Sequence, residues 1–285
     1  MQKRIKIGQI YIDLTYEYDE YFSETIDAYV TDDVCPSPRH LSIETRSRID
    51  VPDRPVTFTY KNRIKMANDK DTYLVTYSGK SVRHMIYYTN DFREIRIILS
   101  DHLAERCAEF EYVLSGMMFF EMALKEGYLP VHASCVSYHG KTFLLSGPSK
   151  SGKSTQTRFF IETFPESMII NEDKPLVFFE NHKPFVIGSP WSGKHVINKN
   201  IKQPIDYIFF VQKDNSLEIR AMSRKEKMTH LFRNIHRPGD EDLVHKMAGI
   251  VTEMLSQIPM FQFHCINQHA SANYLFQFME EYHED

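Results

Sequence analysis

Residues 143–155 of this chain, FLLSGPSKSGKST, contain a complete phosphate-binding loop pattern with Gly147, Gly152, Lys153 and Ser154 at its four fixed positions. The apolar run before the loop predicts a buried strand, and the helical spacing after it predicts a helix. In such a unit, backbone N–H groups surround phosphate oxygens at the positive end of the helix. A chance Gly/Ser-rich turn is the alternative, but both flanking elements favour the functional interpretation. We therefore expect the chain to bind a nucleoside triphosphate.

The side chains of the loop predict ATP and Mg²⁺ as ligands. We expect the Lys153 ammonium to reach the β- and γ-phosphates and the Ser154 hydroxyl to ligate Mg²⁺. The residues expected to contact the nucleotide are Gly147, Pro148, Ser149, Lys150, Ser151, Gly152, Lys153, Ser154 and Thr155.

Two adjacent acids, Glu172 and Asp173, follow the short apolar segment 168–170 downstream of the loop. Phosphoryl transfer needs a second metal anchor and a group that accepts the proton of the incoming nucleophile. Because adjacent residues that leave a strand point in different directions, one acid can enter the Mg²⁺ shell while the other faces the acceptor. A solvated acidic turn is the alternative. We take both acids as candidate catalytic residues.

Two further features have both a functional and a structural interpretation. His132 begins a strand beside the one that leads into the loop, and its position fits a site residue as well as a structural histidine. Residues 188–194, GSPWSGK, form a second glycine-bearing loop. There Lys194 would cover the triphosphate and Trp191 would shape the acceptor pocket. A simple turn explains the same pattern, so both interpretations stay open.

The hydrophobic pattern divides the 285 residues into two predicted domains. Residues 1–100 alternate apolar and polar side chains in short segments between turn-like clusters, which predicts a β-rich N-terminal domain. Its tyrosine-rich strands fit either a peptide-binding face or half-buried sheet positions. Residues 101–285 are assigned to the catalytic domain, which opens with an amphipathic helix over 101–126 that ends at Gly127.

The segment before the loop predicts a mixed sheet rather than a purely parallel one. Residues 131–137 form a predicted strand, and His139 and Gly140 form a hairpin turn that returns the chain to strand 142–145. A doubly wound sheet would place a helix at this point of the chain. The fold class is therefore mixed α/β, or α+β.

A capping box formed by Ser223 and Glu226 opens a predicted helix that continues to about Asn234. Longer-range spacing predicts the remaining elements. Strands are expected at 168–170, 176–179, 184–187, 205–211, 217–222 and 261–265, with 217–222 beside 205–211, and helices at 240–258 and 270–282.

Composition argues against several classes of function. The net charge of −4 and the pI of about 6.4 do not indicate a nucleic-acid partner. No apolar run approaches the roughly 20 residues of a membrane span, so no membrane partner is expected. The cysteines are scattered without a Cys-x-x-Cys pair, which favours reduced thiols in a cytoplasmic protein. They are Cys35, Cys107, Cys135 and Cys265.

Three segments resemble the catalytic domain of HPr serine kinase/phosphorylase: 129–136 (LPVHASCV), the loop at 147–154 and 169–173 (IINED). The resemblance covers roughly residues 100–280. It extends to the broader group of HPr-kinase-like proteins, whose fold is similar to that of ATP-dependent phosphoenolpyruvate carboxykinase. The first hundred residues look more like the variable front end of kinase-like proteins from peptide-modification gene clusters.

The resemblance implies roles for five residues. His132 matches the active-site histidine, Lys153 the phosphate-binding lysine and Ser154 the magnesium ligand. Glu172 and Asp173 match the paired acids, of which the first is the general base toward the acceptor serine and the second helps to hold Mg²⁺. HPr kinases form hexamers, so the resemblance also allows a homo-oligomer.

The sequence departs from the HPr kinase pattern at several places. Thr155 stands where HPr kinases usually have Glu, and Glu172 replaces the first Asp, which moves the base by one methylene. The glycine-rich signature of the bifunctional enzymes is absent, and residues 188–194 occupy that region. These departures weaken the case for phosphorylase activity and for HPr as the substrate, and they leave the expectation of ATP binding in place.

We therefore predict an ATP- and Mg²⁺-dependent kinase that phosphorylates a hydroxyl, expected to be a serine, of a peptide or small protein. A small-molecule kinase on the same scaffold would have a small, closed acceptor pocket instead of an open groove. A nucleotide-binding regulatory module would bind ATP with little phosphoryl transfer. A motor or transporter ATPase is disfavoured because no ABC-type signature follows the loop.

Overall fold

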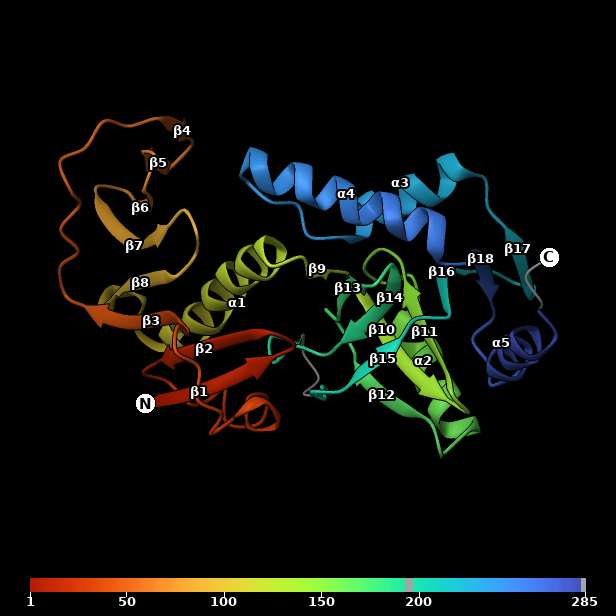
Figure 1. The fold of residues 1–285 in the computed structure, drawn as a ribbon. Coiled ribbons are helices and arrows are strands. Elements are labelled where there is room, and N and C mark those ends of the chain that lie inside the picture. Colours follow the sequence, from red (N-terminus) through yellow and green to blue (C-terminus); the bar gives the residue numbers. More distant parts are fainter. Residues whose placement is uncertain (193–196, 283–285) are drawn as a thin grey trace. The chain divides into compact units, whose positions relative to one another are not determined.

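The computed structural model describes residues 1–192 and 197–282 and has a mixed α+β fold with several sheets (Figure 1). The chain divides into two compact units, Met1–Glu126 and Gly127–Asp285. The boundary therefore lies after residue 126 rather than after residue 100, where the hydrophobic pattern placed it. No helix in the described part of the chain is long and apolar enough to cross a membrane.

Helix α1 (Cys107–Lys125) belongs to the first unit because it packs on the sheet of that unit. It contacts β3 (Arg39–Arg46) and β8 (Glu94–Ser100). Its Glu111 side chain is fully buried and accepts two backbone N–H hydrogen bonds, each 2.9 Å, from Glu17 and Tyr18. The apolar periodicity predicted the helix but carried no information on which sheet it covers.

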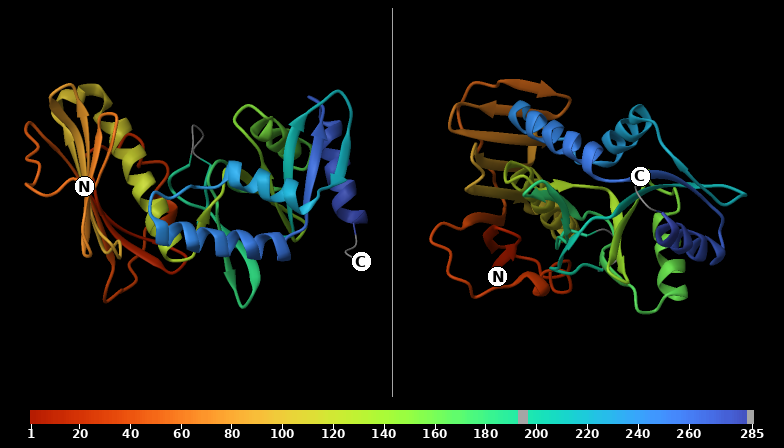
Figure 2. Two further views of the ribbon diagram at one scale, coloured as in Figure 1. Left: turned by 90° about the horizontal axis from the view of Figure 1, so that it is seen from above. Right: turned by 45° about the vertical axis from the view of Figure 1, so that its right-hand side comes forward.

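The first unit is built on an eight-stranded sheet with the order β1-β2-β3-β8-β7-β6-β5-β4. Neighbouring strands are antiparallel except for the pairs β2–β3 and β3–β8. Figure 2 shows α1 along one face of this sheet. The alternating pattern of residues 1–100 agrees with this β-rich unit. Its other elements are β1 (Gln2–Ile7), β2 (Ile10–Thr15), η1 (Asp27–Tyr29), β4 (Phe58–Tyr60), β5 (Arg63–Ala67), β6 (Asp71–Ser78), β7 (Ser81–Thr89) and η2 (Asp101–Arg106).

The second unit contains a six-stranded sheet with the order β12-β10-β11-β16-β18-β17. Strands β11 (Lys141–Ser146), β16 (Tyr207–Lys213) and β18 (Met260–Cys265) run parallel to one another. The outer pairs β10–β11, β10–β12 and β17–β18 are antiparallel. The prediction of a mixed sheet is therefore confirmed.

Two local predictions about this sheet have opposite outcomes. His139 and Gly140 form the two-residue turn between β10 (Ala133–Tyr138) and β11 with φ angles of 49° and 78°, as expected for a tight hairpin. In contrast, β17 (Glu218–Ala221) pairs with β18, so its predicted pairing with β16 is wrong. The reason is that β18, from much later in the chain, lies between them.

The described part of the second unit also contains a smaller sheet and four α-helices. The capping box is confirmed, because the Ser223 hydroxyl accepts from the Glu226 N–H and the Glu226 carboxylate accepts from the Ser223 N–H. The smaller sheet has the order β15-β14-β13-β9. The remaining elements are β9 (Leu129–Pro130), β12 (Met168–Asn171), β13 (Leu176–Glu180), β14 (Lys183–Ile187), β15 (Lys202–Pro204), α2 (Lys153–Thr163), α3 (Arg224–Asn234), α4 (Glu241–Gln257) and α5 (Ala270–Glu281).

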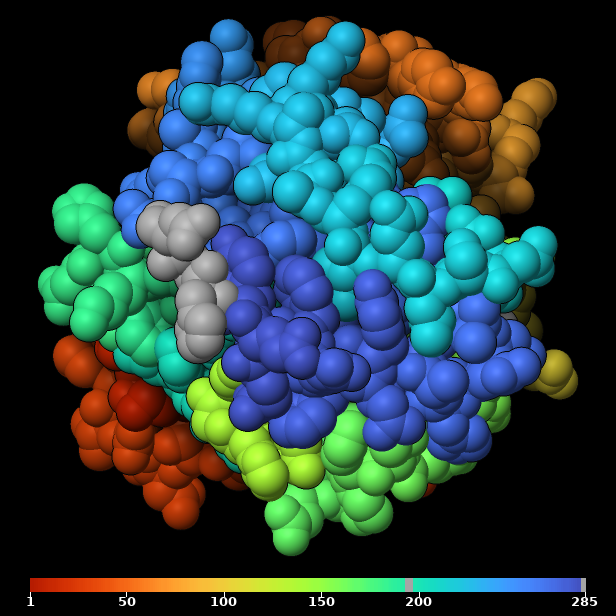
Figure 3. All heavy atoms as spheres, turned by 90° about the vertical axis from the view of Figure 1, so that its right-hand side faces the viewer, coloured from red at the N-terminus to blue at the C-terminus, as the bar shows by residue number. Residues whose placement is uncertain are grey.

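An aromatic core fixes both sides of the phosphate loop. Phe143 of β11 packs against Phe160 of α2 and Phe209 of β16, with ring centroids 4.9 and 6.2 Å apart. Helix α5 packs beside α2 and adds Leu275 to the same buried cluster. Figure 3 shows α5 in dark blue on the surface of the second unit that faces the viewer. The strand before the loop and the helix after it therefore share one rigid core.

Candidate nucleotide site

Residues 147–152 connect β11 to α2, so the predicted strand–loop–helix unit is present. Gly147 has a φ of 149°, in a region that side chains rarely adopt. A Cβ at this position would lie 2.7 Å from the Ser151 hydroxyl oxygen and 3.1 Å from the Val211 carbonyl oxygen. The loop therefore requires glycine at position 147 for its backbone conformation and for its close packing.

Lys153 is the first residue of α2, and its side chain folds back onto the loop. Its side chain is buried, and its ammonium donates hydrogen bonds to the carbonyl oxygens of Gly147 at 2.7 Å and Pro148 at 3.2 Å. Burial lowers the pKa of Lys153, and the negative charge of Asp173 acts in the opposite direction. The ammonium is thus held inside the loop, where phosphate oxygens would be strong acceptors.

The other residues predicted to contact nucleotide line the same loop or the first turn of α2. Pro148, Ser149, Lys150 and Ser154 are exposed, Thr155 is half-buried, and Gly152 is buried with a φ of 110°. The Ser151 hydroxyl is also buried and has no hydrogen-bond partner among the described residues. A ligand could therefore reach four of the residues predicted to contact the nucleotide: Pro148, Ser149, Lys150 and Ser154.

The acidic turn follows β12 directly and is organised by Asn171. The side-chain oxygen Oδ1 of Asn171 accepts the N–H groups of Asp173 at 3.0 Å and Lys174 at 2.8 Å. Its amide donates to the Ser189 carbonyl at 3.1 Å, and the Ser189 hydroxyl donates to the Lys174 carbonyl at 3.1 Å. Fully buried Asn171 therefore joins the acidic turn to the second loop. The sequence motifs assign no role to Asn171; its position at the end of a strand before two acids is the signal that could have identified it.

The side chains of His132 and Asp173 are in contact, with 3.4 Å between His132 Nε2 and Asp173 Oδ1. The pKa of His132 is lowered, first by burial and then by the positive charge of Lys153, while Asp173 raises it. The negative charge of Asp173 also acts on Lys153. Three of the candidate residues named from the sequence thus lie close together.

The backbone of His132 is tied to two neighbouring elements. Its carbonyl accepts the Ser146 hydroxyl at 3.0 Å, immediately before the phosphate loop. Its N–H donates to the Asn234 carbonyl at 2.6 Å, at the end of α3. The end of α3 is therefore part of the wall around the site, which the sequence reasoning missed because no motif marks it.

Glu172, which precedes Asp173 in the acidic turn, has one carboxylate oxygen that is unpaired within the described part of the chain. Its Oε2 atom is buried and has no hydrogen-bond partner among the described residues. Its main chain is held by the Ser134 hydroxyl, which donates to the Glu172 carbonyl at 3.0 Å. A buried carboxylate oxygen without a hydrogen-bond donor is costly, because it loses its contact with water.

The second loop is only partly covered by the structure. Residues 188–192 are buried, and Trp191 is only 3% exposed. Ser189 anchors this loop to the acidic turn. Lys194, which was expected to cover the triphosphate, lies outside the described residues.

The residue types at the site fit Mg²⁺ bound jointly with phosphate oxygens. The described residues contain no group of three or more His, Cys, Asp or Glu side chains that could hold a metal alone. Mg²⁺ in nucleotide sites is usually held by one or two protein oxygens together with phosphates and water. The accessible Ser154 hydroxyl and the half-buried Asp173 carboxylate are suitable ligands of this kind.

The carboxyl end of β16 adds a cation that the sequence reasoning did not consider. A Cβ on Gly152 would lie 3.3 Å from Lys213 Cε, so this lysine stem passes directly over the loop. Parallel strands β11 and β16 end at the same edge of the sheet, which explains the proximity. The signal was available, because Lys213 lies two residues after the predicted buried strand 205–211.

A comparison of the sequence with models of known protein families finds no match, and a comparison with curated proteins finds no match either.

Proposed function

We propose that this protein is an ATP- and Mg²⁺-dependent kinase that transfers the γ-phosphate to a hydroxyl, expected to be a serine, of a peptide or small protein. Its second unit would be an HPr-kinase-like domain. The observation that carries the proposal is the grouping of Lys153, Asp173 and His132 around a glycine-constrained phosphate loop. Sequence resemblance alone suggests the peptide acceptor.

The loop and Lys153 account for binding of the triphosphate. Backbone N–H groups and the N-terminal end of α2 would face the phosphate oxygens. The Lys153 ammonium would stabilise charge on the β- and γ-phosphates as the γ-phosphoryl moves to the acceptor. In this reaction the bond from the γ-phosphorus to the bridging oxygen breaks, a bond to the acceptor oxygen forms, and ADP leaves.

Glu172 is the proposed proton acceptor. Its unpaired Oε2 would take the proton of the acceptor hydroxyl during transfer. His132 would act as a positioning residue, because it contacts Asp173 and its backbone links the phosphate loop to α3. Ser154 and Asp173 would hold Mg²⁺, which neutralises negative charge on the phosphates when it is bound.

Transfer of label from γ-labelled ATP tests this proposal. Wild type, Lys153→Ala and Glu172→Gln would be incubated with Mg²⁺ and a fractionated cell extract, and labelled products would be separated by size. Glu166→Gln is the matched control, because this nearby acid is 83% exposed and lies before β12. We expect label in a peptide or protein with wild type and the control, and a loss of about a hundredfold or more in both site variants.

Three other outcomes would contradict the proposal in different ways. Label in a small metabolite would leave a kinase but remove the peptide acceptor. ATP binding without a labelled product, together with a Glu172→Gln variant that behaves like wild type, would indicate a nucleotide-binding regulatory module. Equal labelling by wild type and Lys153→Ala would show that the phosphate loop does not take part in the transfer.

A further inference from the structure

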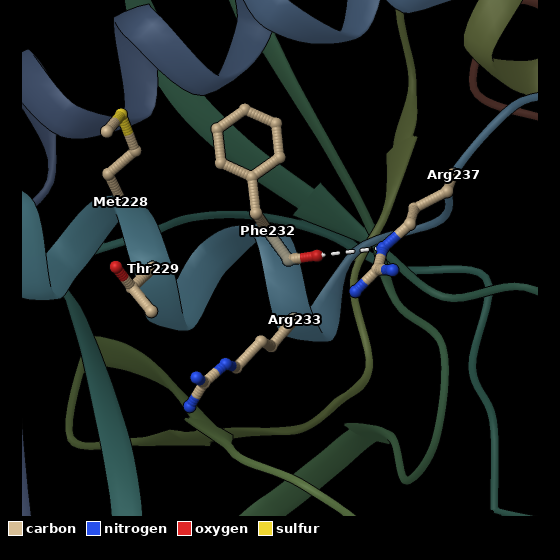
Figure 4. A pocket seen from close by; sticks show the side chains of 5 residues that line it. All are labelled: Met228, Thr229, Phe232, Arg233 and Arg237. Carbon is tan, nitrogen blue, oxygen red and sulfur yellow. Dashed lines mark hydrogen bonds between the residues drawn. The ribbon is translucent and has the colours of Figure 1, made fainter.

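We propose that a pocket at the C-terminal end of α3 binds a carboxylate group of the acceptor peptide. This inference rests on the proposed kinase function and specifies the chemistry of its acceptor. The pocket has a volume of about 470 Å³. It is lined by Met228, Thr229, Phe232, Arg233 and Arg237 (Figure 4).

The pocket adjoins the candidate site through the backbone. The Asn234 carbonyl accepts the His132 N–H, and Ile235 forms a β-bridge with Val131. The His236 N–H donates to the Pro130 carbonyl at 2.9 Å, which extends this pairing. Arg233 and Arg237 immediately flank the paired segment. The two pocket arginines are therefore adjacent in the chain to the segment whose backbone pairs with residues 130–132.

The two arginines provide positive charge that no side chain within residues 1–192 and 197–282 neutralises in an ion pair. Both are exposed, and neither forms an ion pair with a described residue. Arg237 donates one hydrogen bond, from Nε to the Phe232 carbonyl at 3.1 Å, as Figure 4 shows. Arg220, beside the other end of α3, is different because it pairs with Glu226 at 2.8 Å. The remaining N–H donors of both pocket arginines are available to a ligand.

The chemistry of the pocket favours a carboxylate on a peptide. Guanidinium groups bind planar carboxylates through paired hydrogen bonds. The Met228 side chain and the half-buried Phe232 ring provide apolar surface for the rest of the peptide. Attraction to the negative end of α3 explains why cations lie here, but it does not explain apolar walls around them. The phosphates of the nucleotide already have the loop and Lys153 as partners.

Peptide binding measured by fluorescence anisotropy tests the inference without requiring phosphoryl transfer. The probes are fluorescein-labelled serine peptides: one with aspartates beside the serine, one with asparagines in their place, and each with a free or an amidated C-terminus. The full-length protein would be used as wild type, Arg233→Ala, Arg237→Ala and Arg224→Ala. Arg224 is the control because it is exposed on the same helix but begins it, away from the pocket.

We expect wild type to bind at least one carboxylate-bearing peptide about tenfold or more tightly than its fully neutral counterpart. Arg233→Ala and Arg237→Ala should each lose most of this preference, and Arg224→Ala should keep it. The aspartate and C-terminal arms identify which carboxylate is bound. ATP affinity, measured separately by calorimetry, should be unchanged in the pocket variants.

Three results would overturn the inference. The first is the absence of any carboxylate preference in wild type, and the second is full retention of that preference in both pocket variants. The third is a loss of ATP affinity in these variants with peptide binding unchanged, which would assign the arginines to the nucleotide. Failure of label transfer with wild type would contradict the kinase proposal but would not change these binding results, so the two failures are distinguishable.

Discussion

Replacement of Gly147 by alanine tests whether the phosphate loop is as tightly constrained as the structure indicates. The new Cβ would lie 2.7 Å from the Ser151 hydroxyl oxygen and 3.1 Å from the Val211 carbonyl oxygen. The serine hydroxyl is buried, so moving it aside carries a cost, and the carbonyl belongs to β16 and can move only with the sheet. The φ of 149° adds backbone strain for any residue with a side chain.

The expected cost combines two terms of similar size. Backbone strain of this kind costs about 1–3 kcal/mol, and overpacking a rigid site costs about 1–3 kcal/mol. A Gly→Ala substitution also lowers the conformational entropy of the unfolded chain, which offsets this cost by about 0.4–1 kcal/mol. We therefore expect Gly147→Ala to lower the free energy of unfolding by about 2–4 kcal/mol.

Gly140 provides a matched control for backbone strain without overpacking. It has a φ of 78°, and a Cβ there would meet nothing within 4 Å. Gly140→Ala should therefore cost only about 1 kcal/mol. A Ser151→Ala background should reduce the cost of Gly147→Ala by about 0.5–1 kcal/mol, because the nearest contact atom is removed.

Urea unfolding followed by tryptophan fluorescence measures these differences in the free energy of unfolding of the second structural unit. The protein has one tryptophan, Trp191, which is buried in the second unit. Its emission therefore reports on the unit that holds the loop. Equal costs for Gly147→Ala and Gly140→Ala, or no effect of Ser151→Ala on the first, would refute the packing argument.

Three further predictions concern pH and local stability. Burial lowers the pKa of His84 to about 4 from an ordinary value of 6.5, with Arg83 and Arg63 contributing. Because the folded pKa is depressed, His84 stabilises the first unit above pH 6.5. About 3 kcal/mol of this is lost as pH falls toward 4. Urea unfolding followed by circular dichroism should show this loss in wild type and a smaller one in His84→Gln; equal acid sensitivity would contradict it. Asp173→Asn should lower the pKa of His132 further, because Asp173 raises it; an NMR titration that shows no change or a rise would refute this contact. Ser223→Ala should cost about 1 kcal/mol in Trp191-monitored urea unfolding, since it removes the N-cap of α3. Thr252→Ala on the exposed face of α4 is its control, and an equal cost in both would remove the capping argument.

Local sequence signals predicted the parts of the fold that short-range physics decides. The glycines and Lys153 identified a strand–loop–helix unit, and the structure places that lysine within the loop. Ser223 and Glu226 identified a helix start because the two side chains satisfy each other's backbone groups. His139 and Gly140 identified a hairpin because both residues tolerate positive φ.

Long-range pairings were not predictable in the same way. Strand 218–221 resembles any short exposed strand, and nothing in it indicates that β18 rather than β16 is its neighbour. The apolar face of α1 shows that the helix is covered but not by which sheet. Chain topology decides both points, and periodicity within one element carries no topological information.

The candidate site was predictable where residue chemistry identifies a role. Carboxylates, a histidine and a lysine were recognised in the sequence, and the structure brings Lys153, Asp173 and His132 together. Asn171 and Asn234 were missed because each acts through a backbone group or an amide that many buried asparagines use for ordinary turns. Their importance depends on neighbours from other elements.

Calorimetric titration with ATP in the presence of Mg²⁺ tests most directly whether residues 147–154 hold a triphosphate. Wild type, Lys153→Ala and Lys183→Ala would each be titrated with ATP and with AMP; Lys183 is the control because it is exposed on β14. We expect wild type and the control to bind ATP about tenfold or more tightly than AMP, and Lys153→Ala to lose about tenfold or more of its ATP affinity. Wild type without ATP binding, or Lys153→Ala with wild-type affinity, would contradict the account.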